Sequence, residues 1–453
     1  MEGISTIGFD MDYTLAIYKQ PEIDRLSVIA TVDKLVVERG YPAELKELPF
    51  DCGFPIRGLL IDKDRGNILK MDRYKYVKSA YHGSVELPRE ERHLLYHQRV
   101  PRRDPPYYYV DTLYALPEAA MYAAIVPILE ERGVEFSYER LFLDIRECID
   151  ASHRDGSILD VMLADLDRFV FRDPDLAPTL HKFRSAGKRL FLLTNSQWAY
   201  TDRMMTYLLG GAMPKYPTWR HYFDIIVVAA RKPSFFTESA PLLERDGDRF
   251  EPATSLERGK IYEAGNLRDF ERLAACSGDQ ILYIGDHIYG DILRSKKDSA
   301  WRTAMVIQEM EQEISVGTTV AAELARRDEL EERRAQREDD LRFHQARWKA
   351  LQRTDAASAP DAEASRARHK AAIEAARSEL RQLTAEMHRL DRAIDGAFHP
   401  HWGPLFKAGP EVSRFGDQVE EYACLYTSRV SNFLRYSPLQ YFRSPRDRMP
   451  HEM

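Results

Sequence analysis

The chain has 453 residues and a formal charge of −7, which argues against a nucleic-acid-binding protein because such proteins present a basic face. Hydrophobic residues make up 44% of the chain and charged residues 30%, enough to bury a core in about two or three domains. The cysteines are far apart and form no Cys-x-x-Cys pair, so the sequence indicates neither a disulfide framework nor a zinc site, and a reducing compartment fits best.

Short apolar segments alternate with helical ones along much of the chain. Strands that alternate with helices are typical of a parallel sheet wrapped by helices, so we predict an α/β fold. The strand-like segments are 4–9, 189–193, 223–228, 281–284 and 303–307. Four of the five end on polar residues, and in such sheets the active site lies beyond the carboxyl ends of the strands.

The long segment 26–179 lies between the first two of these strands. It contains a hairpin-like pair of runs at 58–62 and 66–70, and helical patterns around 117–132 and 138–166. A segment of this length is too long for a loop, so we predict an inserted cap that recognises the substrate. The catalytic core is then formed by 1–25 and 180–310.

Residues 320–395 are rich in Ala, Arg and Glu. In their second half apolar residues recur at spacings of 7, 3, 4, 3 and 4, which is a heptad seam. The residues of this seam are Ile373, Leu380, Leu383, Met387, Leu390 and Ile394. A break at 355–361, with Pro360, predicts an antiparallel helical hairpin with arms about 50 Å long at ~1.5 Å per residue. The alternatives are a solvated spacer and a partner-binding arm, and 396–453 is predicted to pack on the core.

Two carboxylates, Asp10 and Asp12, directly follow the first strand. Like charges this close repel unless a cation or a shared proton compensates, and a hard divalent ion with oxygen ligands does so. Thr194, Lys232 and Asp286 come after three of the later strands, in this order. An isolated Asp-x-Asp pair is a weak signal, but the whole set fits one reaction.

That reaction is phosphoryl transfer from a phosphate monoester. Mg²⁺ held by Asp10 and Asp286 would neutralise the repulsion between a carboxylate nucleophile and the dianionic substrate. Asp10 would carry the covalent phosphate, while Asp12 would protonate the leaving alkoxide and then deprotonate water. Lys232 and Thr194 would stabilise the transferring oxygens with positive charge and a hydroxyl donor.

These residues stand in longer runs that resemble the haloacid dehalogenase-like superfamily and, within it, the cytosolic purine 5'-nucleotidase family. The runs are Gly8-Phe9-Asp10-Met11-Asp12-Tyr13-Thr14-Leu15-Ala16, Leu193-Thr194-Asn195-Ser196, Ala230-Arg231-Lys232-Pro233 and Gly285-Asp286-His287-Ile288-Tyr289-Gly290-Asp291. The resemblance implies a Rossmannoid parallel sheet and a magnesium-dependent enzyme that hydrolyses IMP and GMP through an aspartyl-phosphate. It also implies transfer of the phosphoryl group to other nucleosides. A weaker resemblance resumes at 422–452.

The resemblance also implies a role for each site residue. Asp10 and Asp286 are then ligands of Mg²⁺, and Asp12 contributes its backbone carbonyl. The phosphate-binding residues are Thr194, Asn195, Ser196 and Lys232. Asp291 would orient Lys232 or a water at the metal, with a helix N-cap as the alternative, and His287 is expected to be a packed or capping histidine.

Nucleoside recognition is expected from the cap. Segment 144–153 is similar to the family's nucleoside-binding helix, and Arg146, Asp150 and His153 fall on one face of that helix at spacings of 4 and 3. From spacing alone, a solvated charged face is the alternative. Tyr114 matches the residue that stacks on the base. The chain departs from the family at Leu159, where a lysine is usual, and at Ala115, where an asparagine is usual.

The expected ligand is therefore a purine nucleoside monophosphate, with a sugar phosphate or another small monoester as the alternative. A third interpretation is a catalytically silent scaffold that recruits a partner through the helical hairpin. No apolar run reaches membrane-spanning length, and Asp10 and Asp12 stand where a signal peptide would be apolar. We therefore expect a cytoplasmic protein that binds neither membranes nor nucleic acid, and a homo-oligomer is compatible with the sequence.

Overall fold

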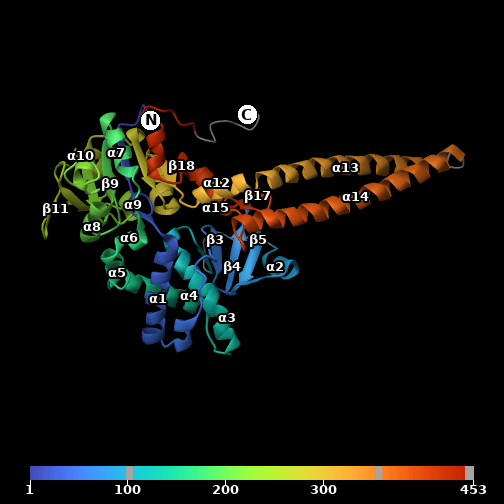
Figure 1. Cartoon of the computed structure of the whole chain (residues 1–453), viewed down its shortest axis with the longest axis horizontal. Coiled ribbons are helices and arrows are strands. Elements are labelled where there is room, and N and C mark those ends of the chain that lie inside the picture. The colour runs from blue at the N-terminus through green and yellow to red at the C-terminus, as the bar shows by residue number, and fades with distance from the viewer. Residues whose placement is uncertain (98–105, 354–359, 444–453) are drawn as a thin grey trace. The chain divides into compact units, whose positions relative to one another are not determined.

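The structure, a computed structural model, describes residues 1–97, 106–353 and 360–443 (Figure 1). It divides into two compact units. The first unit comprises Met1–Met310 with Leu405–Met453, and the second comprises Glu311–Pro404. The end of the weaker resemblance, Met449-Pro450-His451-Glu452, lies outside the described residues.

The first unit is built on a nine-stranded, mostly parallel sheet in the order β12-β11-β13-β10-β9-β1-β14-β15-β18. Strand β1 pairs in parallel with β9 on one side and β14 on the other, so it lies near the middle of the sheet. The strands expected from the sequence are β1 Thr6–Phe9, β9 Arg189–Leu193, β10 Ile225–Val228, β14 Ile281–Gly285 and β15 Arg302–Val306. Each lies within two residues of its predicted bounds, so the predicted α/β fold is confirmed.

Strands that the sequence did not reveal lie at the edges of this sheet. On one side β13 pairs in parallel with β10, and the antiparallel hairpin of β11 and β12 extends the sheet further. On the other side β18 pairs in parallel with β15, so the C-terminal segment contributes a strand to the core. Their bounds are β11 Leu242–Asp246, β12 Arg249–Pro252, β13 Ile261–Ala264 and β18 Leu425–Thr427.

An aromatic cluster supports the sheet directly beneath the site. The rings of Phe191 and Tyr283 are stacked with centroids 6.1 Å apart, and Trp301 packs on both. Gly8 faces Phe191 so closely that any side chain at position 8 would overlap the ring. The glycine in β1, two residues before Asp10, is therefore required for β1 and β9 to pair at this register. The helices around this sheet are α7 Leu176–Ser185, α8 Trp198–Leu209, α9 Ser234–Thr237, α10 Leu267–Ala274, α11 Arg294–Asp298 and α15 Arg414–Tyr422.

The inserted segment forms a five-stranded antiparallel sheet, β6-β5-β4-β3-β7, together with a group of helices. The predicted hairpin is confirmed as β3 Leu59–Asp62 and β4 Asn67–Met71. The remaining strands are β5 Val77–His82, β6 Val85–Glu86 and β7 Tyr107–Tyr109, and the helices are α1 Gln20–Arg39, α2 Arg89–Tyr96, α3 Leu116–Glu131, α4 Tyr138–Arg154, α5 Leu159–Ala164 and α6 Leu166–Phe169. Two short strands, β2 Ile17–Tyr18 and β8 Val170–Phe171, pair where the chain leaves and re-enters the core.

The helical pattern predicted over 138–166 is interrupted. Helix α4 ends at Arg154, and Gly156 follows with φ +87°, a conformation that L-residues with side chains rarely adopt. Two shorter helices then complete the segment. The break matters because it lets α4 and α5 present separate residues to the same cavity.

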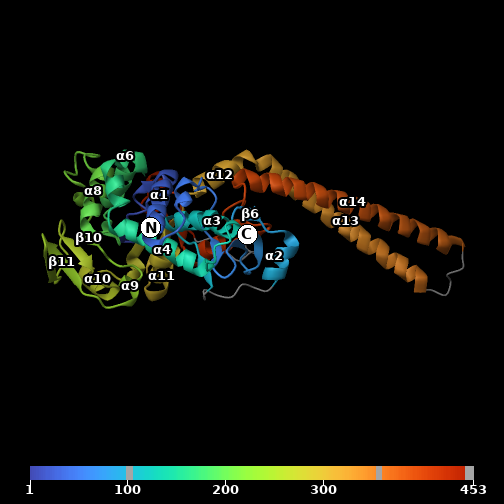
Figure 2. The ribbon, with the colours of Figure 1, turned by 90° about the horizontal axis from the view of Figure 1, so that it is seen from below.

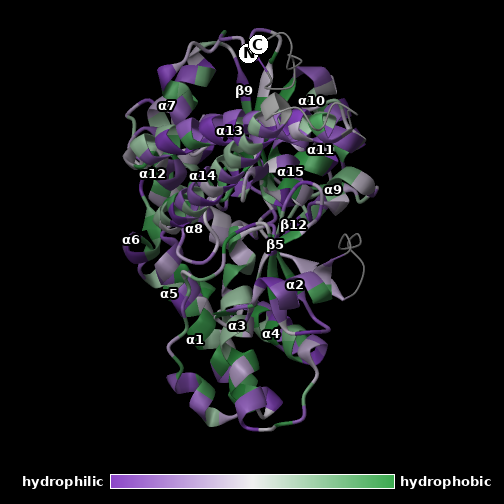
Figure 3. Cartoon of the chain, turned by 90° about the vertical axis from the view of Figure 1, so that its right-hand side faces the viewer, coloured by the Kyte–Doolittle hydropathy of each residue, from purple (hydrophilic) through white to green (hydrophobic). Residues whose placement is uncertain are grey.

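One stretch of the described chain, Leu113–Glu131, is long and apolar enough to cross a membrane by length and composition, contrary to the expectation that no apolar run reaches that length. Most of it is α3, and 72% of the apolar window is buried inside the protein. Figure 3 shows α3 largely in green and pale tones. Such burial is typical of the central helix of a folded domain.

The predicted helical hairpin of the second unit is confirmed (Figures 1 and 2). Its arms are α13 Ala321–Arg353 and α14 Pro360–Phe398, preceded by α12 Met310–Thr319, and the turn at 354–359 lies outside the described residues. Arg326 pairs with Glu386 and Arg333 pairs with Glu379, so the arms run in opposite directions. Of the predicted seam, four residues are buried: Ile373, Leu383, Met387 and Ile394.

Two short strands, β16 Lys407–Ala408 and β17 Glu411–Val412, form a hairpin in the C-terminal part of the first unit.

Candidate active site

The predicted catalytic residues gather at one edge of the central sheet. Asp10 directly follows β1, Thr194 follows β9, Asp286 follows β14, and Lys232 lies in the loop after β10. Because these four strands are parallel neighbours, their carboxyl ends meet at the same edge. The sheet therefore brings together residues that are far apart in the sequence.

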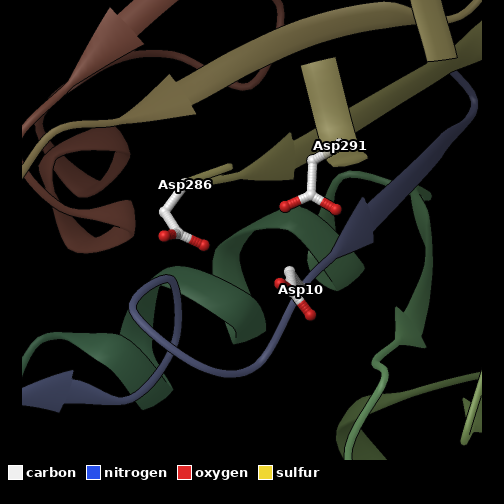
Figure 4. A group of neighbouring side chains, drawn as sticks. All are labelled: Asp10, Asp286 and Asp291. Atoms are coloured by element: carbon white, nitrogen blue, oxygen red, sulfur yellow. The ribbon is translucent and has the colours of Figure 1, made fainter. Parts of the chain in front are cut away.

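Three buried carboxylates form a cluster at this edge. Asp10, Asp286 and Asp291 each present an oxygen within 4.8 Å of the others. Figure 4 shows the three side chains pointing into a common space from the ends of β1 and β14 and the turn that follows. A Cβ at Gly285 would lie 2.6 Å from the Asp291 side chain, so a glycine at this position allows Asp291 to reach the cluster.

One lysine faces the three carboxylates. The Lys232 Nζ lies 2.9 Å from Asp10 Oδ1 and 2.7 Å from Asp291 Oδ1. Burial opposes the charge on Lys232, but Asp10 and Asp291 outweigh it and raise the pKa of the ammonium. Burial in turn raises the pKa of Asp10 and Asp286. The carboxylate of Asp286 receives no hydrogen bond from the described residues.

The cluster therefore carries more negative charge than Lys232 can compensate. A hard divalent cation with oxygen ligands fits this donor set, since it would supply the missing positive charge where the carboxylate oxygens converge. Asp291 belongs to the cluster and accepts a hydrogen bond from the Lys232 ammonium. This contact agrees with the predicted role of orienting Lys232. The N-cap of this turn is instead His287, whose Nδ1 accepts from the backbone N–H groups of Tyr289 and Gly290.

The carboxylate of Asp12 is held by two hydroxyl groups. The Tyr18 hydroxyl donates to Oδ1, and the Ser196 hydroxyl donates to Oδ2 over 2.6 Å. Tyr18 also bonds Tyr200 over 2.8 Å. Burial raises the pKa of Asp12, while the hydrogen bonds from Ser196 and Tyr18 oppose this rise. A fixed carboxyl group with a raised pKa is suited to giving up and recovering a proton.

The predicted phosphate-binding residues differ in whether they line the cavity or support the loops around it. Ser196 and Asn195 line the cavity, but the Asn195 amide also bonds the backbone of Lys232, accepting from its N–H over 2.6 Å and donating to its carbonyl over 2.9 Å. Thr194 is fully buried and its hydroxyl accepts from the Ser196 N–H over 3.1 Å. Asn195 and Thr194 thus support the loops that present Lys232 and Ser196.

A cavity of about 530 Å³ connects the carboxylates to the cap. At one end it is lined by Asp10, Asp12 and Asp286. The other end is lined by the predicted nucleoside-binding residues Arg146, Asp150, His153 and Tyr114, and by the two departures from the family, Leu159 and Ala115. The structure therefore places the predicted nucleoside-binding residues in one cavity with Asp10, Asp12 and Asp286, whereas Thr194 and Lys232 do not line it.

The cap end of this cavity contains ordered aromatic and charged contacts. Tyr114 and His153 stack with ring centroids 4.6 Å apart. Burial lowers the pKa of His153 to about 4, so its imidazole is neutral at pH 7. The guanidinium of Arg146 lies over the Tyr108 ring at 4.7 Å. These contacts hold Arg146 and His153 beside the space available to a ligand.

Sequence reasoning missed several residues of this site. Tyr18 and Tyr200 support Asp12, and Glu118 lines the cap end of the cavity. Glu118 has a recognisable signal, because it is the one charged residue in the apolar stretch 116–129. The tyrosines have none, since their contact joins positions 182 residues apart.

The whole chain, residues 1–453, matches the model of the 5' nucleotidase family. The chain belongs to this family. As a member of the 5' nucleotidase family it is a phosphohydrolase, with the buried aspartate cluster as its candidate active site. The family assignment agrees with the parallel sheet and with the position of Asp10 at the end of β1.

Two curated relatives of this 5' nucleotidase family member span its full length. It is 30% identical to 5'-nucleotidase domain-containing protein 2 of Rattus norvegicus over 471 residues, covering 100% of this chain and 78% of the relative. It is 28% identical to a 5'-nucleotidase domain-containing protein of Dictyostelium discoideum over 469 residues, covering 100% of this chain and 73% of the relative. Neither name specifies a purine substrate. The relatives therefore support the 5' nucleotidase family but not the purine-specific family that the sequence resembles.

Solved structures show more distant similarity. An archaeal beta-phosphoglucomutase from Pyrococcus is 11% identical with a TM-score of 0.32, covering 67% of this chain and 86% of that one. An L-2-haloacid dehalogenase from Xanthobacter autotrophicus is 12% identical with a TM-score of 0.23, covering 67% and 78%. Neither similarity bears on what this chain acts on.

Proposed function

We propose that this protein is a Mg²⁺-dependent 5'-nucleotidase that hydrolyses purine nucleoside 5'-monophosphates, preferring IMP and GMP, and can transfer the phosphoryl group to a nucleoside. The observation that carries the proposal is the single cavity that joins the carboxylate cluster to Arg146 and His153. Its two ends match the two halves of a nucleotide. One end has the groups that process a phosphate, and the other has a guanidinium and aromatic rings.

Asp10 and Asp286 would hold the Mg²⁺, with the backbone carbonyl of Asp12. When bound, Mg²⁺ supplies positive charge that offsets the repulsion between Asp10 and the phosphate and aligns the phosphoryl group. Lys232 keeps an ammonium directly beside the Asp10 carboxylate. This fixed charge would stabilise the negative charge of the transferring oxygens.

The chemistry proceeds in two steps. Asp10 attacks phosphorus while the bond to the 5' oxygen breaks, and Asp12 gives its proton to that leaving oxygen. In the second step Asp12 takes a proton from water or from an acceptor hydroxyl, whose oxygen attacks phosphorus and releases Asp10. Tyr18 and Ser196 hold the Asp12 carboxylate in place for both transfers.

The nucleoside would lie toward the cap. The Arg146 guanidinium can donate to the oxygen at purine position 6, and Tyr114 or His153 can stack on the base. The two rings now stack on each other, so a base entering between them must first separate them. Adenine carries an amino group at position 6, which would leave the donors of Arg146 unpaired at a cost of about 1–3 kcal/mol.

The experiment is a comparison of kcat/KM for IMP, GMP, AMP, UMP and a sugar phosphate, repeated with Arg146→Ala. IMP and GMP should exceed AMP by about tenfold or more, as expected when a buried donor is left unpaired. Preference for AMP, UMP or the sugar phosphate would refute the purine assignment. An equal loss of all substrates in Arg146→Ala would show that Arg146 is not directed to the base.

The covalent mechanism is tested by Asp10→Asn, because an amide cannot form the acyl phosphate. Turnover should vanish while the circular-dichroism spectrum and Tm stay near those of the wild type. Activity close to that of the wild type in this variant would rule out Asp10 as the nucleophile. No turnover of any phosphate ester by the wild type with Mg²⁺ would instead favour the scaffold interpretation.

A further inference from the structure

Glu118 is a buried acidic residue with no role in the mechanism described above. It lies in α3 and is only 3% exposed, although the rest of this part of the helix is apolar. Its side chain lines the cap end of the active-site cavity. Burying a carboxyl group is costly unless it is paired, so its partners show what it can bind.

The carboxylate of Glu118 is not saturated by the protein. Its Oε2 accepts no hydrogen bond from the described residues, and the Arg146 Nε lies 3.8 Å away, beyond hydrogen-bond distance. Arg146 is held both by its contact with the Tyr108 ring and by this long ion pair with Glu118. Asp111 and Asp150 lie close enough to oppose the negative charge of Glu118. The cavity therefore contains an acceptor and, beside it, a donor, both with capacity to bind a ligand.

We propose that Glu118 is a specificity-determining residue that accepts hydrogen bonds from N1–H of a 6-oxopurine and from the 2-amino group of guanine. This inference rests on the proposed nucleotidase function and deepens it. The edge of guanine presents an acceptor at O6, followed by donors at N1 and the 2-amino group. Arg146 matches the acceptor, and Glu118 matches the two donors, in the same order.

The same pair of side chains disfavours adenine. Its 6-amino group would face the donors of Arg146, and its unprotonated N1 would face the lone pairs of the Glu118 carboxylate. Hypoxanthine keeps O6 and N1–H but lacks the second donor. The expected order of kcat/KM is therefore GMP, then IMP, then AMP, because the site leaves more groups unpaired at each step.

The test is Glu118→Gln, which keeps the size of the side chain but replaces one acceptor with a donor. Each nucleotide is measured against p-nitrophenyl phosphate, an ester without a base, so that changes in phosphoryl chemistry cancel. The quantity compared is kcat/KM for each nucleotide divided by kcat/KM for p-nitrophenyl phosphate. In Glu118→Gln this ratio should fall about tenfold or more for GMP and fall less for IMP. For AMP it should stay level or rise. Glu130→Gln is the matched control. It lies on the same helix, and its carboxylate pairs with His82 rather than lining the cavity, so it should leave all ratios unchanged.

A binding measurement separates recognition from catalysis. Calorimetric titration of guanosine and adenosine into Asp10→Asn, with and without Glu118→Gln, should show a weaker guanosine Kd only when Glu118 is replaced. Equal losses for all bases, or unchanged ratios between the bases in Glu118→Gln, would overturn the role of Glu118 while nucleotide turnover by the wild type still supported the nucleotidase. If the wild type cleaves p-nitrophenyl phosphate but neither cleaves nucleotides nor binds nucleosides, the nucleotidase proposal and this inference both fail.

Discussion

At the scale of single residues, the site depends on an imbalance of charge. One ammonium faces the three carboxylates of Asp10, Asp286 and Asp291. Burial raises the pKa of Asp10 and Asp286 because water cannot solvate their charged forms. An apolar core would not tolerate such a group of charges without a compensating ion. The same residues that make this edge of the sheet costly to fold make it suited to bind a cation and a phosphate together.

This imbalance predicts a metal requirement. Chelation with EDTA should abolish phosphatase activity, and added Mg²⁺ should restore it. Asp286→Ala should raise the Mg²⁺ concentration for half-maximal activity by about tenfold or more, since an anionic oxygen ligand is lost. The measurement is a titration of activity against free Mg²⁺, with calorimetry of Mg²⁺ binding as a second readout. Full activity in metal-free buffer would contradict the assignment.

Glu118 predicts a pH dependence of base selection. Burial raises the pKa of this carboxyl to about 7, so it is largely neutral at pH 6 and largely charged at pH 8. Only the charged form accepts from both donors of guanine, whereas the neutral form can donate to N1 of adenine. The ratio of kcat/KM for GMP over AMP should therefore rise from pH 6 to pH 8. The rise should disappear in Glu118→Gln, and a ratio that falls with pH would contradict the assigned charge state.

At the scale of elements, the helical hairpin depends on a narrow apolar contact. Leu330 of α13 packs against Leu383 and Met387 of α14, and ion pairs such as Arg327 to Asp391 flank this contact. Ile373 and Ile394 of α14 are buried as well, whereas Figure 3 shows α13 largely in purple. Exposed ion pairs contribute little, so the apolar contacts should supply most of the stability of the pair.

Replacing Leu383 by Ala should therefore destabilise the hairpin by about 2–5 kcal/mol, the usual cost of removing a buried leucine side chain. Hydrogen exchange of the amides in α13 and α14 measures this loss in the intact chain. Leu324→Ala is the matched control, because Leu324 is exposed and its removal leaves no cavity. Equal protection in both variants would show that the seam is not the main source of stability.

At the scale of the whole molecule, chemistry and the hairpin belong to different units. Every proposed catalytic residue lies in the unit formed by Met1–Met310 and Leu405–Met453, while the hairpin lies in Glu311–Pro404. Each unit has its own buried contacts. The catalytic unit is therefore expected to retain its site when the hairpin is shortened.

Replacing residues 320–395 with a short flexible linker should leave kcat/KM for GMP within about threefold of the wild type, because no group that contacts phosphate or base is removed. The measurement requires a folded protein, verified by its Tm, and its oligomeric state from sedimentation. Loss of activity in a folded variant with the assembly of the wild type would show that the hairpin shapes the site.

Local patterns in the sequence were enough to predict the elements and the chemistry of the catalytic edge. The apolar runs at 189–193 and 281–284 became strands, and the heptad spacing of 373–394 became a helical hairpin, because hydrophobic periodicity is a local property of the chain. Asp10, Lys232 and Asp286 could be assigned to one edge since parallel strands end together.

Which side chains contact one another depends instead on the folded arrangement of the chain. The support of Asp12 by Ser196, the bonding of the Lys232 backbone by the Asn195 amide, and the open acceptor of Glu118 beside Arg146 involve positions distant in the sequence. The edge strands β11, β12 and β18 also escaped prediction, because they are short and their residues are partly exposed. No local pattern encodes the side-chain contacts of the site, because they arise only when the cap and the sheet fold into one unit and enclose the same cavity.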